Sequence, residues 1–68
     1  MDENDEIEIE AKQRYLTETK FRVAVDRAVG ISIPEKFKKT SPRNLYHALR
    51  EQAISSASIA IVTYEKLR

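Results

Sequence analysis

Cysteine is absent from this chain of 68 residues, so disulfides cannot stabilise its fold and thiolate ligands for zinc are missing. A single glycine, Gly30, cannot build the glycine-rich loops with which many enzymes hold nucleotide phosphates. The one histidine, His47, has the bases Arg43 and Arg50 one helical turn away, not a carboxylate that would orient a catalytic imidazole. We therefore expect a protein that is not an enzyme and that holds no metal and no cofactor.

Long apolar runs are absent as well. The longest stretch without a charge, residues 52–64, has thirteen residues and includes three serines. A membrane-spanning helix needs about 20 mostly apolar residues, so this stretch is too short. The first ten residues carry six acids and no base, whereas the start of a signal peptide is basic. These features predict a cytoplasmic protein without a membrane segment.

The small size of the chain indicates self-association. Residues 1–68 suffice for a single domain, and a domain of this size buries only about 60 % of the surface of its unfolded chain. Without disulfides or a metal, oligomerisation is the remaining common source of stability. The sequence therefore predicts a homo-oligomer.

The C-terminal part of the chain, residues 42–67, predicts one long helix. Ser41 and Pro42 suit the start of a helix, and neither glycine nor proline follows them. An alternative ends the helix near Ile54 and places a strand at 58–64, where β-branched residues gather. Apolar and small residues recur here at steps of three and four, which favours the helix and a close contact between subunits. This predicted interface stripe comprises Leu45, Tyr46, Leu49, Ala53, Ala57, Ala60, Tyr64 and Leu67.

The N-terminal half allows two structures. Acid-to-base pairs four residues apart, such as Glu8–Lys12, Glu10–Arg14 and Glu18–Arg22, favour a helix over residues 5–29 with a break near 17–19. Alternating apolar residues around 7–11 and 21–25 would instead suit a β-hairpin ahead of the long helix. Gly30 would end the first helix, residues 30–41 would form a loop, and residues 1–4 would be a frayed acidic terminus.

Charge is distributed unevenly. The acids gather in residues 1–10, and residues 36–50 contain five bases and no acid. The basic segment could contact phosphates of a nucleic acid at a helix N-terminus, or it could dock against the acidic terminus of a neighbouring subunit. The candidate contacts to a nucleic acid are Lys36, Lys38, Lys39, Arg43, Asn44, His47 and Arg50.

Together these patterns predict an all-α helical hairpin that assembles into a bundle through the interface stripe. The expected function is that of a small interaction module, a regulator, adaptor or assembly subunit that also binds another protein. The alternative hypothesis is a regulatory protein that binds nucleic acid through residues 36–50.

Overall fold

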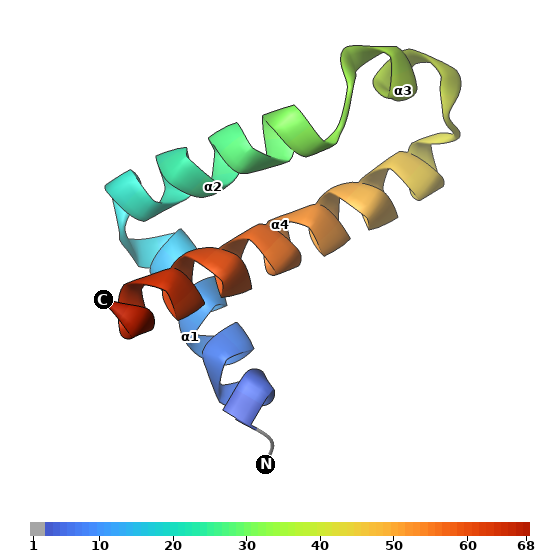
Figure 1. The fold of residues 1–68 in the computed structure, drawn as a ribbon. Coiled ribbons are helices and arrows are strands. Elements are labelled where there is room, and N and C mark those ends of the chain that lie inside the picture. Colours follow the sequence, from blue (N-terminus) through green and yellow to red (C-terminus); the bar gives the residue numbers. More distant parts are fainter. Residues whose placement is uncertain (1–2) are drawn as a thin grey trace.

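The computed structural model describes residues 3–68 and contains four helices, α1 (Glu3–Thr17), α2 (Thr19–Ser32), α3 (Glu35–Thr40) and α4 (Arg43–Leu67) (Figure 1). No strand occurs within these residues, so the predicted all-α class is confirmed and the β-hairpin alternative is not supported. A frayed terminus was predicted at residues 1–4, and residues 1 and 2 lie outside the described range.

The break near residues 17–19 is confirmed at Glu18, whose backbone is extended between α1 and α2. No glycine or proline makes this turn. Instead, the guanidinium of Arg22 donates to the carbonyl oxygens of Tyr15 and Leu16, at 3.2 Å and 3.1 Å. These carbonyls belong to the last turn of α1, where helix carbonyls lack partners within the helix. Arg22 therefore stabilises the end of α1, and the predicted Glu18–Arg22 pair is replaced by an ion pair between Glu18 and Arg14.

The predicted loop at residues 30–41 is wrong in large part. Gly30 lies inside α2, its φ is not positive, and the helix continues to Ser32. Pro34 provides the stop, because proline has no N–H to donate and its neighbour is driven into an extended conformation. A short helix, α3, fills most of the remaining segment. The predicted long helix is present as α4, whose first backbone hydrogen bond is accepted by Pro42 rather than by Ser41.

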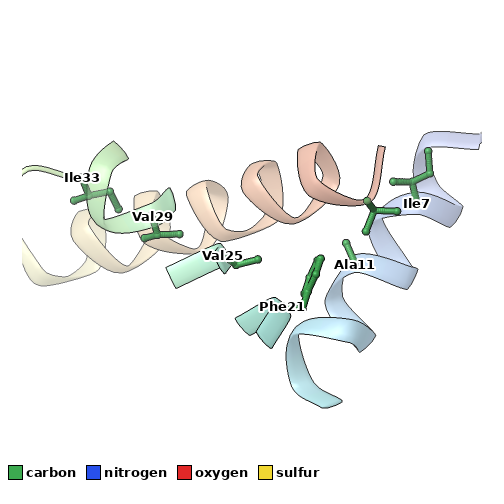
Figure 2. Packing of buried hydrophobic residues seen from close by; sticks show 7 residues of the cluster. Ile7, Ala11, Phe21, Val25, Val29 and Ile33 are labelled. Carbon is green, nitrogen blue, oxygen red and sulfur yellow. The ribbon is translucent and has the colours of Figure 1, made fainter. Parts of the chain in front are cut away.

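The core lies where α1, α2 and α4 meet. Phe21, Val25 and Val29 recur at intervals of four along α2 and form its buried face. Figure 2 shows these side chains pointing towards the residues contributed by α1 and α4. The buried apolar residues are Ile7, Ala11, Phe21, Val25, Val29, Ile33 and Val62.

Ion pairs tie α1 to the C-terminal end of α4. Lys66 pairs with Glu10 at 3.0 Å, and Arg14 pairs with Glu65. The predicted Glu8–Lys12 pair is present at 3.2 Å, but Glu10 and Arg14 each pair across the helix contact rather than with one another. The guanidinium of Arg14 also lies 4.5 Å from the centre of the Phe21 ring.

The molecule is elongated, with extents of 38 × 26 × 20 Å and a radius of gyration of 12.9 Å. A compact domain of this length would have a radius of gyration of about 11 Å. The excess follows from α4, which is longer than the helices that pack on it (Figure 1). Both α1 and α2 contact α4, and α3 lies near its N-terminal end. A long helix with so few neighbours keeps one side uncovered.

Candidate interaction surface

The side of α4 that packs on α1 and α2 is formed by Ile54, Ser58, Ile61 and Val62. Val62 and Ser58 are each 1 % exposed, and the two isoleucines are half-buried. Ile54 precedes Ser58 by four residues, and Ile61 and Val62 follow it by three and four, so they share one face of the helix. The hydroxyl of Ser58 finds no hydrogen-bond partner among the described residues. The inward face is thus built of β-branched residues around one small buried serine.

The opposite side of α4 carries no charged residue from Leu45 to Leu67. We call this side the uncharged face, and in a chain in which 34 % of the residues are charged it is a distinctive surface. Leu67 is 83 % exposed and Leu45 is 48 % exposed, while the centre of the face holds small or polar side chains. Its residues are Leu45, Leu49, Gln52, Ser56, Ala60, Thr63 and Leu67.

The predicted interface stripe overlaps the uncharged face, because Leu45, Leu49, Ala60 and Leu67 belong to both. Four of its members, Leu45, Ala60, Tyr64 and Leu67, are exposed. The other four are half-buried, and Tyr46, Ala53 and Ala57 pack against the core beside α2. Leu49 is the remaining half-buried member. The structure therefore places part of the predicted stripe on the exposed side of α4 and packs Tyr46, Ala53 and Ala57 against the core.

An apolar groove adjoins the uncharged face near the N-terminal half of α4. It has a volume of about 320 Å³ and is open to solvent along the helix. Ile33, Pro34 and Phe37 form one wall, and Leu49 and Ala53 belong to the other. The lining residues are Ser32, Ile33, Pro34, Phe37, Leu49, Gln52, Ala53 and Ser56. The groove thus extends the uncharged face sideways toward the junction of α2 and α3.

The basic segment lies at the end of the molecule that carries α3, away from the start of α1 (Figure 1). All seven predicted nucleic-acid contacts have exposed side chains, on α3 and on the first turns of α4. Lys38 forms an ion pair of 3.6 Å with Glu35, and Lys38 also lines a small pocket together with Arg50 and Asp26. Within residues 5–68, the ammonium or guanidinium groups of Lys36, Lys39 and Arg43 form no ion pair.

Several titratable side chains are joined by hydrogen bonds. Hydrogen bonding to Arg14 lowers the pKa of Glu65 below 4.5, and a hydrogen bond from Ser55 lowers the pKa of Glu8. The Tyr15 hydroxyl donates to Asp26 at 2.8 Å, which raises the pKa of Tyr15. His47 is exposed and meets the edge of the Tyr46 ring. In the described part of the chain, no group of three metal-ligating side chains comes together.

Neither a known family model, nor a curated protein, nor a solved structure matches this chain. None of the helices within residues 3–68 combines the length and the apolar character required to cross a membrane.

The groove was not predicted from the sequence. Ile33 and Phe37 fell in a segment expected to be a loop, so their packing against α4 was not anticipated. Because the extended residues Ile33 and Pro34 separate α2 from α3, no helical periodicity in the sequence connects Ile33 with Phe37. It was also unclear which side of α4 would face inward, because apolar or small residues occur around most of that helix.

Proposed function

We propose that this protein is a non-enzymatic interaction module that self-associates through the uncharged face of α4. The observation that carries the proposal is the uncharged face itself, which runs from Leu45 to Leu67, holds no charged residue and has an exposed leucine at each end. A helix face exposed to water normally carries charged side chains, whereas a face that is buried by a partner loses them. Exposed leucines beside small, uncharged side chains on one helix face suit a protein–protein contact.

The energetics of a small chain support the same proposal. Only a few large side chains are fully or nearly fully buried in this domain, and four exposed apolar side chains lie on other helices in addition to those of α4. A 68-residue domain without disulfides has marginal stability as a monomer. Covering Leu45 and Leu67 by a partner would remove further apolar surface from water, at about 25 cal/mol per Å².

A pair of charge insertions on α4 tests the proposal. Ala60→Glu places a carboxylate in the middle of the uncharged face, and Ala48→Glu places the same group at an exposed position of the same helix outside that face. Light scattering coupled to size exclusion is expected to give an oligomer for the original protein and for Ala48→Glu, and a monomer for Ala60→Glu. Circular dichroism should show equal helix content in all three. Equal masses for both variants would contradict the proposal.

A second function, binding of nucleic acid, is favoured by the exposed bases of α3 and early α4. Lys36, Lys39 and Arg43 are exposed and have no ion-pair partner within residues 5–68, so they are available to phosphates. Replacing these three by alanine should abolish a salt-sensitive shift of DNA or RNA, because each phosphate contact contributes to the salt dependence. The charge-matched control replaces Lys20, Arg27 and Arg68, which are exposed elsewhere. Absence of any binding at low salt would eliminate this second function.

A further inference from the structure

The residues of the uncharged face are arranged symmetrically about Ser56. Going outward from Ser56 in both directions, the next members of the face are Gln52 and Ala60, four residues away on each side. Leu49 and Thr63 follow at seven residues, and the outermost members, Leu45 and Leu67, follow at eleven. The face therefore has the same spacing when it is followed from either end, with leucine at both ends and small or uncharged residues between.

Such a face is complementary to itself in the antiparallel direction. In a two-fold symmetric contact, each residue i meets a residue j whose own copy meets i in return. If two α4 helices lie antiparallel with Ser56 at the two-fold axis, Leu45 of each copy meets Leu67 of the other. A parallel pair would bring leucine onto leucine as well, but it would place Tyr64 at the same height as its own copy and far from the groove.

Tyr64 supplies an independent indication of the antiparallel arrangement. Its side chain is 67 % exposed. Tyr64 lies on the same side of α4 as Tyr46 and Ala53, which are nearer the N-terminus of that helix and pack against the core. In the antiparallel pair, Tyr64 comes level with Ala48 of the other copy, next to Leu49 at one end of the groove. This groove of about 320 Å³ lies between α4 and the wall of Ile33 and Phe37. Because the two-fold axis keeps the α2 sides of both helices on the same side of the dimer, the tyrosine and the groove face each other.

We propose that the partner of the uncharged face is a second copy of this chain, packed with its α4 antiparallel about Ser56 and with Tyr64 of each copy in the groove of the other. This inference rests on the proposed self-association and specifies its geometry. The contact would run for about 33 Å along α4, at 1.5 Å per residue. The two tyrosines would add aromatic surface to this contact, and a specific interface requires about 1,000 Å² in total.

The absence of cysteine allows this geometry to be tested by single introduced thiols in the full chain. Ser56→Cys should form a disulfide-linked dimer on mild oxidation, because the two positions lie at the axis. Leu45→Cys and Leu67→Cys should each stay unlinked alone and should link to one another when the two variants are mixed. The mixed pair separates the two directions, since a parallel dimer would link Leu45→Cys to itself.

The role of Tyr64 is tested by the dissociation constant of the dimer. Tyr64→Ala should raise that constant by about 30-fold or more, as expected for a central aromatic anchor. The control is Leu16→Ala, which removes a side chain of similar exposure (69 %) on α1, outside the uncharged face, and should leave the constant unchanged. Sedimentation equilibrium measures both variants.

The outcomes separate this inference from the function on which it rests. A dimer in solution that links Leu45→Cys to itself, or that is indifferent to Tyr64→Ala, would leave self-association in place and overturn the antiparallel packing. A protein that stays monomeric at all concentrations would overturn both. Linkage of the mixed pair together with weakening by Tyr64→Ala would establish the antiparallel dimer.

Discussion

The two sides of α4 differ in what covers them and in which residues they contain. The inward face, with Val62 and Ser58 at 1 % exposure, is built from short, β-branched or small side chains that fit closely against α1 and α2. The uncharged face has leucines at its ends and leaves Leu67 at 83 % exposure. Both faces lack charge, yet only one has a partner within the chain. Absence of charge on a helix face thus identifies surfaces suited to burial, and the fold of one chain covers only some of them.

A matched pair of alanine substitutions should separate the two faces most clearly. Val62→Ala is expected to lower the free energy of unfolding by about 2 kcal/mol, because it removes buried methyl groups and leaves a cavity. Leu45→Ala removes a larger side chain, but Leu45 is 48 % exposed, so the loss should be below about 1 kcal/mol in dilute solution. Urea denaturation at low protein concentration measures both. Equal losses would contradict the distinction between the faces.

Replacing a serine of α4 by alanine should change the free energy of unfolding less than Val62→Ala does, and in the opposite direction. Ser58→Ala should raise the free energy of unfolding by about 1 kcal/mol, because it removes a buried hydroxyl that has no partner among the described residues. Ser56→Ala, on the uncharged face, changes the same side chain in contact with water. Any gain from helix propensity is common to both variants, so the difference in their unfolding midpoints isolates the buried hydroxyl. If Ser58→Ala is no more stable than Ser56→Ala, the hydroxyl of Ser58 is satisfied in solution.

The smallest expected change in stability comes from the ion pair between Arg14 of α1 and Glu65 near the C-terminal end of α4. Because the pKa of Glu65 is lowered in the folded protein, its carboxylate favours folding above pH 4.5, and this contribution is lost as the pH falls through the lowered value. Glu65→Gln should therefore flatten the decline of the urea midpoint between neutral pH and about pH 3. Glu51→Gln changes an exposed carboxylate outside the ion pairs of residues 5–68 and should leave the decline unchanged. An unaltered slope in Glu65→Gln would contradict this account.

Part of the fold could be predicted because it depends on local rules. The length of α4 and the break near Glu18 follow from residue spacing, residue type and the absence of glycine and proline after Pro42. Gly30 was expected to end a helix, but Pro34 does so four residues later, because a glycine in a helix is tolerated when the flanking residues pack. The short helix α3 lies in a lysine-rich segment that was predicted to be a loop.

The candidate surface was only partly predictable. The sequence predicted Leu45, Ala60 and Leu67 as interface residues, and the structure leaves all three exposed, but the sequence could not place Ala53 and Ala57 against the core. That assignment depends on the direction from which α1 and α2 approach α4, which is a tertiary property. The groove required the same information, since its two walls, Ile33 with Phe37 and Leu49 with Ala53, come from separate helices.

The central claim is that the uncharged face of α4 is covered by a second copy of the chain, and sedimentation equilibrium of the unmodified protein tests it most directly. As the protein concentration rises, the weight-average mass is expected to increase from the monomer value of 7.9 kDa to twice that value, with Ala60→Glu remaining at the monomer mass. A mass that stays at 7.9 kDa at every concentration would contradict the claim.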